Sequence, residues 1–149
     1  MRVYCDSAYN DRLKVAGIGI VIQKDGHERT YSYFVKCASN NLGELYAIKL
    51  AGIIAEGKGI IYTDSMHAIN YIKGNFNKDK PRTLAQYIEM KRNELVAYEI
   101  RAQQLQIEHI KGHQHNFQLH SMGNRLADLL AKRGIAKYIE LQKVLTKER

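Results

Sequence analysis

The sequence predicts an α/β fold in which helices flank one mixed β-sheet. Residues 16–22 and about 29–36 alternate with a period of two, as half-buried strands do. Asp25-Gly26 lies between these two runs and is a strong hairpin signal, because both residues tolerate a positive φ. After residue 40 the apolar spacing changes to about 3.6 residues, with two further strand-like segments among the helices. The predicted order is β-β-β-α-β-α-α-β-α, which gives a five-stranded sheet.

The first three strands are predicted at residues 2–6, 16–22 and about 29–36. The second alternates Gly or Val with Ile, and the third places Tyr31 and Phe34 on opposite faces, because side chains alternate along a strand. The hairpin that joins these two strands makes one side of the sheet antiparallel.

A first helix is predicted after Ser39-Asn40-Asn41, and Gly57 ends it. Residues 60–64 form the fourth strand, and a short helix that stops at Gly74 follows. The apolar stripe of the first helix consists of Leu45, Ile48, Gly52 and Ala55.

In the second half, residues 75–82 contain the only proline and are predicted to be a connection. A longer helix covers residues 83–102, and the fifth strand lies at residues 104–109. A last helix covers about residues 122–134, and the tail 135–149 is compatible with a helix but has no clear capping signal. The apolar stripe of the long helix consists of Leu84, Ile88, Leu95 and Tyr98.

The length and composition predict one domain. With 149 residues and 45% hydrophobic content, residues 1–149 are expected to bury a single core of ordinary size. We expect a soluble, cytoplasmic monomer without membrane contact, because no apolar segment reaches bilayer length and no signal peptide precedes the first strand. Cys5 and Cys37 are predicted to be buried free thiols, with a disulfide between them as the alternative.

The charge of the chain is basic and uneven. The net charge is +8, and residues 75–149 contribute +6 of it, with 14 Lys or Arg against 8 Asp or Glu. A basic domain favours a polyanionic partner, and nucleic acid fits better than a membrane because no basic helix with a strong apolar face is present. The alternative is a basic surface that interacts only with solvent.

One phrase, Tyr-x-Asp-Ser, ends two separate apolar runs. Tyr4-Cys5-Asp6-Ser7 ends the first strand and Tyr62-Thr63-Asp64-Ser65 ends the fourth. If these strands are parallel neighbours, Asp6 and Asp64 meet at the carboxyl edge of the sheet, where open α/β folds bind ligands. Two like charges held there need a cation. Either Asp alone is better explained by a turn after a strand, but the matched pair favours a shared site.

Two more carboxylates stand at candidate positions. Glu44 follows Asn41 by three residues, which is the spacing of a capping box at the start of a helix. Asp128 lies inside the last helix, where Asp is a poor helix former, and Lys132 one turn later is a candidate ion-pair partner. Taken singly, each of these acids is better explained by a structural role.

These residues belong to four motifs. Asp6 lies in a first strand, Asn40-Asn41-x-x-Glu44 opens a first helix, Thr63-Asp64-Ser65 ends a fourth strand, and Lys111-Gly112-His113 precedes Gly123-Asn124-x-x-x-Asp128. In this order they resemble type 1 ribonuclease H, and the resemblance covers residues 2 to about 134. Each motif alone is weak, but the four in register are specific.

The resemblance implies a ribonuclease H-like fold and an endonuclease that hydrolyses the RNA strand of RNA/DNA hybrids, leaving 5′-phosphate and 3′-hydroxyl ends. It implies Asp6, Glu44, Asp64 and Asp128 as catalytic metal ligands. Four clustered acids cannot all ionise without cations, and two Mg²⁺ ions about 3.5 to 4 Å apart would neutralise them. Hard oxygen ligands suit Mg²⁺, with Mn²⁺ as a substitute, better than zinc.

The resemblance also implies a histidine beside the carboxylates. His113 corresponds to a residue that assists proton transfer or product departure, with His115 and His120 as neighbouring alternatives. A zinc site built from His109 and these three histidines is a weaker alternative, since no cysteine joins them.

Substrate contacts follow from the same resemblance. Asn40 and Asn41 correspond to residues that read the minor groove of the hybrid, where 2′-hydroxyls are accessible. Ser7 and Ser39 are expected to contact sugar or phosphate groups. Candidates for contacts to the DNA strand are Lys111, Arg125, Lys132 and Arg133.

The chain departs from the family pattern at several places. Ser7 replaces a glycine, Met66 replaces a glutamine that contacts the minor groove, the connection 75–82 is too short for a basic helical protrusion, and the loop 113–123 is longer than usual. Two other functions stay open, a DNA-cutting nuclease of the same superfamily and a hybrid-binding module with weak catalysis.

Overall fold

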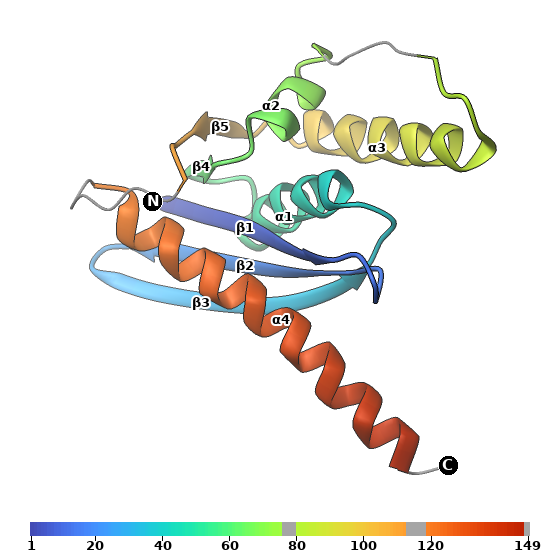
Figure 1. The fold of residues 1–149 in the computed structure, drawn as a ribbon. Helices are drawn as coiled ribbons and strands as arrows, with labels where there is room; N and C mark the ends of the chain where they lie inside the picture. The colour runs from blue at the N-terminus through green and yellow to red at the C-terminus, as the bar shows by residue number, and fades with distance from the viewer. Residues whose placement is uncertain (76–79, 113–118, 148–149) are drawn as a thin grey trace.

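A five-stranded mixed sheet lies at the centre of the structure (Figure 1). The structure is a computed structural model that describes residues 1–75, 80–112 and 119–147. The order across the sheet is β3-β2-β1-β4-β5, which confirms the predicted mixed sheet. The strands are β1 (Arg2–Asn10), β2 (Val15–Lys24), β3 (His27–Lys36), β4 (Ile60–Thr63) and β5 (Gln106–His109).

The hairpin between β2 and β3 forms at the predicted dipeptide. Asp25 has a φ of 52° and Gly26 a φ of 75°, the left-handed values that a tight two-residue hairpin turn requires. β2 and β3 pair antiparallel along their whole length, and β1 pairs antiparallel with the other edge of β2.

The two copies of the Tyr-x-Asp-Ser phrase lie side by side. β1 and β4 pair in parallel with Tyr4 opposite Tyr62, as the phrase predicted, and the two rings stack with centroids 5.3 Å apart. Asp64 directly follows the last residue of β4. Asp6 lies where β1 loses its β4 neighbour, although β1 continues to Asn10 along β2 instead of ending at the predicted residue 6.

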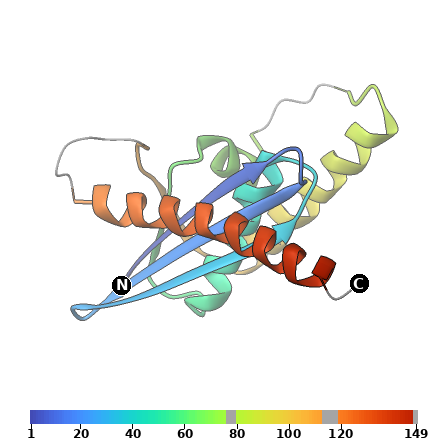
Figure 2. The ribbon, with the colours of Figure 1, turned by 60° about the horizontal axis from the view of Figure 1, so that its bottom comes forward.

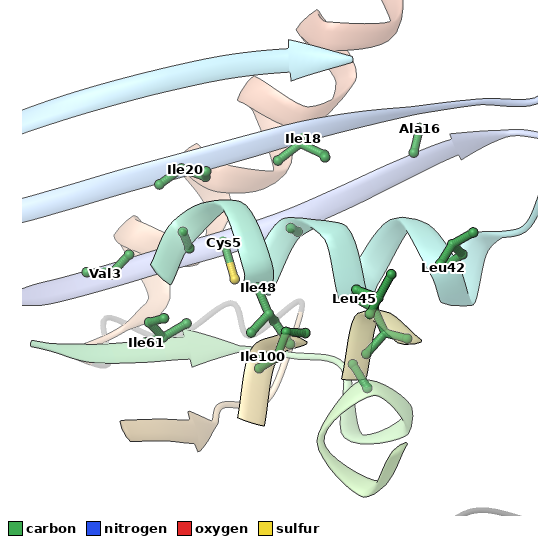
Figure 3. Close-up of a cluster of buried hydrophobic side chains, with 14 of the residues drawn as sticks. Val3, Cys5, Ala16, Ile18, Ile20, Leu42, Leu45, Ile48, Ile61 and Ile100 are labelled. Carbon is green, nitrogen blue, oxygen red and sulfur yellow. The ribbon is translucent and has the colours of Figure 1, made fainter. Parts of the chain in front are cut away.

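Helices cover both faces of the sheet. On one face lie α1 (Asn40–Ile54), α2 (Met66–Ile72) and α3 (Leu84–Ala102), whereas α4 (Ser121–Lys147) alone crosses the other face (Figure 2). The smaller core under α4 consists of Tyr4, Val21, Tyr62, Ala127 and Leu130. The larger core around α1 includes Val3, Cys5, Ile18, Ile20, Leu45 and Ile48 (Figure 3).

The predicted buried face of α3 is wrong. Leu84, Ile88, Leu95 and Tyr98 are all exposed. The helix buries instead its C-terminal half, through the stripe Asn93, Val96, Ala97 and Ile100. The sequence of α3 therefore contains two apolar stripes, the predicted one and the one that is buried. Periodicity alone does not reveal which of the two packs against α1.

The predicted end of the last helix at Gly134 is also wrong, because α4 continues to Lys147. Gly134 does not end the helix but lets it approach the sheet, since a Cβ at this position would overlap the carbonyl oxygen of Tyr33 in β3. The tail is therefore helical as far as the structure describes it.

Cys5 and Cys37 are free and buried, as predicted, so the disulfide alternative is rejected. Among the described residues, no helix combines the length and the apolar character needed to cross a membrane.

Two glycines of β2 bring α4 close to the sheet. A Cβ at Gly17 would overlap the carbonyl of Ala131, and a Cβ at Gly19 would overlap that of Ala127. These contacts fix the backbone of α4 on both sides of Asp128.

We expect Gly17→Ala to lower the free energy of unfolding by about 3 kcal/mol, because the added methyl group meets helix backbone that cannot rotate away. Urea titration followed by circular dichroism measures the change. Gly26→Ala is the control, since nothing lies within 4 Å of its Cβ and only its φ of 75° is unfavourable. That strain costs about 1 kcal/mol. Equal losses in the two variants would contradict the close packing of α4.

Candidate metal site

Three carboxylates from separate elements converge at one edge of the sheet. Asp6 lies in β1, Glu44 in α1, and Asp64 directly after β4. One oxygen from each side chain lies within 4.8 Å of the oxygens from the other two. The meeting of Asp6 and Asp64 that the doubled phrase predicted is confirmed, and Glu44 joins them from the helix.

Short hydrogen bonds fix the turn that carries Asp64. The Ser65 N–H donates to Thr63 Oγ1 at 3.1 Å, and the Ser65 hydroxyl caps α2. The Ile110 N–H, just after β5, donates to the Thr63 carbonyl at 2.9 Å. Gly112 follows so closely that a Cβ there would lie 2.8 Å from Asp64 Oδ2. The turn is therefore held by its own hydrogen bonds and by the residues that follow β5.

Glu44 does not form the capping box that its spacing suggests. Ser39 is the N-cap of α1, and its hydroxyl accepts from the Leu42 N–H at 3.2 Å. The helix therefore begins before Asn41, and Glu44 lies further inside it than a capping box requires. Its Oε2 is buried and has no hydrogen-bond partner in the described part of the chain. A buried carboxylate oxygen without a partner needs a proton or a cation.

Asp128 approaches the same cluster from α4. Its carboxyl group lies close enough to Asp6 to help raise the pKa of that acid, although Asp128 is not one of the three acids whose oxygens lie within 4.8 Å of one another. The Nζ of Lys132, one turn later on α4, lies 2.9 Å from Asp128 Oδ2, so the predicted ion pair is present. Asp128 therefore pairs with a positive charge and acts electrostatically on one acid of the cluster, Asp6.

Burial and mutual repulsion keep protons on these acids. Burial raises the pKa of Asp6 to about 8, and the charge of Asp64 adds to the rise, whereas the Ser7 N–H, which donates to Asp6 Oδ1 at 2.9 Å, opposes it. Burial also raises the pKa of Glu44 to about 9, with Asp6 and Asp64 adding to the effect. Without a cation, both acids are mostly protonated at neutral pH.

The predicted substrate-contacting residues lie at the start of α1 and in β1. Asn40 is exposed and Asn41 half-buried, directly after the capping Ser39. The Ser7 hydroxyl instead points at α1, where a Cβ on Gly43 would lie 2.6 Å from it, and it is buried without a hydrogen-bond partner among the residues described. Contacts of these residues with a substrate stay predictions.

Four basic residues predicted to contact nucleic acid are all exposed: Lys111, Arg125, Lys132 and Arg133. Met66, the first residue of α2, is exposed as well.

His113 and His115 lie outside the described residues, so their parts in the site stay predictions. His109 ends β5, and His120 directly precedes α4. Within the described ranges, the carboxylate cluster is the only group of three or more His, Cys, Asp or Glu side chains placed to hold a metal ion. The described histidines therefore form no zinc site of their own.

The side chains of Tyr4, Tyr62 and His120 form an aromatic cluster that was not predicted from the sequence. The Tyr4 hydroxyl lies 2.8 Å from His120 Nδ1, and the His120 ring centroid lies 4.2 Å from that of Tyr62. The backbone of Gly123 in α4 packs against the Tyr4 ring, because a Cβ at this position would lie 2.5 Å from the ring atoms Cδ2 and Cε2. The two tyrosines of the doubled phrase were a signal for this cluster. His120 was predicted only as an alternative histidine beside the carboxylates, and nothing local in the sequence pointed to its contact with the tyrosines.

The donor set of the carboxylate cluster fits a hard divalent cation. It offers carboxylate oxygens only, one of them the unpartnered Oε2 of Glu44. Such a cluster at the edge of a mixed α/β sheet is typical of enzymes that use metal ions to cleave or transfer phosphate esters.

The sequence model of the RNase H family matches residues 1–136. The chain therefore belongs to the RNase H family. Residues 137–147 of α4 lie beyond the matched region. No curated protein matches the sequence.

Several solved structures share the fold. RNase H1 of the halophilic archaeon Halobacterium salinarum NRC-1 is 21% identical with a TM-score of 0.65, and the match covers 91% of this chain and 97% of that one. The N-terminal RNase H domain of a Mycobacterium tuberculosis protein is 17% identical with a TM-score of 0.64, covering 95% and 98%. LC11-RNase H1, isolated from compost by a metagenomic approach and solved with an RNA/DNA hybrid, is 18% identical with a TM-score of 0.55, covering 93% and 98%.

In the presence of a chelator, we expect the free energy of unfolding to fall as the pH rises from about 4 to about 9. The pKa values of Asp6 and Glu44 are about 8 and about 9 in the folded protein, against ordinary values of 3.8 and 4.5. The folded state therefore binds more protons than the unfolded state in this window, and stability is lost as these protons leave.

Denaturant titrations across this pH range measure the slope. The double variant Asp6→Asn, Glu44→Gln keeps the shapes of both side chains without their ionisation, and it should show a flatter dependence. An equal slope in both proteins would contradict the raised pKa values.

Tyr4→Phe should lower the free energy of unfolding by about 1 kcal/mol, because it removes the hydroxyl that contacts His120. Tyr62→Phe makes the same change on the stacked ring and should have little effect, since the Tyr62 hydroxyl has no hydrogen bond among the residues described. Thermal unfolding compares the two variants. A larger loss in Tyr62→Phe would show that the Tyr4–His120 contact is not the important one.

Proposed function

We propose that this chain is an endoribonuclease that hydrolyses the RNA strand of RNA/DNA hybrids and leaves 5′-phosphate and 3′-hydroxyl ends. The observation that carries the proposal is the convergence of Asp6, Glu44 and Asp64 within 4.8 Å in a chain that the RNase H family matches over residues 1–136. The complex of LC11-RNase H1 with an RNA/DNA hybrid, a structure of the same fold, supports the hybrid as substrate.

We infer that Mg²⁺ is the natural cation and that Mn²⁺ can replace it, because all the donors are hard carboxylate oxygens. Asp6, Glu44, Asp64 and Asp128 would together hold two ions. When bound, such ions lower the pKa of the attacking water and stabilise the leaving oxygen of an in-line displacement.

The protein's own contribution is to hold the acids in place before a substrate arrives. Asp6 and Glu44 carry protons in the cation-free protein, so the cluster avoids most of its internal repulsion. They must lose these protons to bind a cation, and the parallel pairing of β1 with β4 keeps Asp6 close to Asp64 while they do. A site fixed in this way needs little rearrangement during the reaction.

The hybrid would lie across the sheet edge and the start of α1. Asn40 and Asn41, which open that helix, would contact bases and 2′-hydroxyls in the minor groove. Ser39, and the backbone at Ser7, would contact sugar or phosphate groups, and the exposed basic residues would neutralise phosphates without reading sequence.

His113 is proposed to assist proton transfer or product departure. The support is its place in the sequence directly after Gly112, which lies against Asp64. A histidine suits this role because its ordinary pKa lies near neutral pH.

We predict that the protein cuts labelled RNA/DNA hybrid with Mg²⁺ or Mn²⁺ and not with a chelator. Asp64→Asn should lower kcat by more than about a hundredfold, since even residues that only support metal ligands have effects of that size. Asp11→Asn is the matched control, because Asp11 is an exposed carboxylate that pairs with Lys14 away from the cluster, and it should retain full activity.

Each contrary outcome points to a different conclusion. Undiminished hybrid cleavage by Asp64→Asn would remove Asp64 from the site. Equal cleavage of duplex DNA would favour a DNA-cutting nuclease of the same superfamily. Binding of the hybrid without cleavage in either metal would favour a hybrid-binding module.

A further inference from the structure

Lys132 places a positive charge on Asp128, the acid that α4 contributes beside the carboxylate cluster. Its Nζ lies 2.9 Å from Asp128 Oδ2, and Asp128 in turn acts electrostatically on Asp6. Asp128, through its hydrogen bond and charge, and Asp6, more weakly, raise the pKa of the Lys132 ammonium group. The ammonium group contacts Asp128, and the more distant Asp6 affects it only through its charge.

The ion pair can open at little cost. The Asp128 side chain is 28% exposed and that of Lys132 64% exposed, so water screens their attraction. Lysine carries its charge on a flexible four-carbon chain, so the ammonium group can leave without movement of α4. The helix backbone itself stays fixed, because Gly17 and Gly19 hold it against β2.

A divalent cation and the Lys132 ammonium group compete for the same carboxylate. Both bind its oxygens, and two positive charges a few ångströms apart repel each other. The divalent cation carries twice the charge and can bind several of the acids at once, whereas the ammonium group binds one. A sufficient cation concentration therefore displaces Lys132, and the displacement weakens the apparent affinity for the cation.

We propose that Lys132 is an internal counter-ion that competes with a divalent cation for Asp128 and thereby sets the cation concentration at which the site fills. This inference rests on the proposed function, in which Asp128 is a metal ligand. Lys132 stabilises the Asp128 carboxylate in the cation-free protein and moves away when the cation binds.

Isothermal titration with Mg²⁺ and with Mn²⁺ tests the proposal on the wild type, Lys132→Met and Lys132→Arg. Lys132→Met removes the charge and keeps an unbranched side chain, and its Kd for the cation should fall at least about threefold. Lys132→Arg restores the charge and should behave like the wild type. The matched control is Lys143→Met, because Lys143 forms an ion pair with Glu140 on the same helix, 3.4 Å apart and away from the cluster.

Thermal unfolding gives a second readout that does not depend on activity. In a chelator, Lys132→Met should melt at a lower temperature than Lys143→Met, because Asp128 has lost its counter-ion. At saturating Mg²⁺ the difference should disappear. The KM for the hybrid at saturating Mg²⁺ reports separately on any contact between Lys132 and nucleic acid.

The proposal is overturned if Lys132→Met binds the cation no more tightly than the wild type, or if Lys143→Met shows the same gain. It is also overturned if the wild type binds no divalent cation. A wild type that binds Mg²⁺ but does not cut the hybrid would remove the proposed function alone, since the comparison of Kd values would still decide the part that Lys132 plays.

Discussion

Repulsion between carboxylates that are held together is the constraint on which the rest of this structure depends. Oxygens of Asp6, Glu44 and Asp64 lie within 4.8 Å of one another in a partly buried position. Burial and the neighbouring charges raise the pKa of Asp6 to about 8 and that of Glu44 to about 9. Such a cluster is stable either with protons and no cation, or ionised with a cation between the acids. The site therefore couples proton loss to cation binding.

The fold opposes this repulsion with backbone contacts. The parallel register of β1 and β4 fixes where Asp6 and Asp64 emerge, and the rings of Tyr4 and Tyr62, two residues earlier in the chain, stack on each other. Gly19 holds α4 close to β2 beside Asp128. Rigid contacts of this kind keep together acids that would otherwise separate. The repulsion that remains between the acids lowers the stability of the fold, as is common at functional sites.

Features that depend on local chemistry were predictable from the sequence. The Asp25-Gly26 turn and the meeting of Asp6 with Asp64 follow from turn preferences and from the alternation of side chains along strands. Glu44 was predicted as a ligand only by the family resemblance, because its spacing from Asn41 imitates a capping box while the actual cap is Ser39. Gly134 looked like a helix end because its contact with β3 is not local. The contact between Tyr4 and His120 spans 116 positions of the sequence, which no periodicity reveals.

The coupling between protons and cations can be measured directly. Calorimetric titration of the protein with Mg²⁺ at pH about 7, repeated in buffers of different ionisation enthalpy, counts the protons released when the cation binds. Because the pKa values of Asp6 and Glu44 are about 8 and about 9, we expect release of more than one proton per protein. The double variant Asp6→Asn, Glu44→Gln should release none. Cation binding by the wild type without proton release would contradict the coupling, as would the absence of any cation binding.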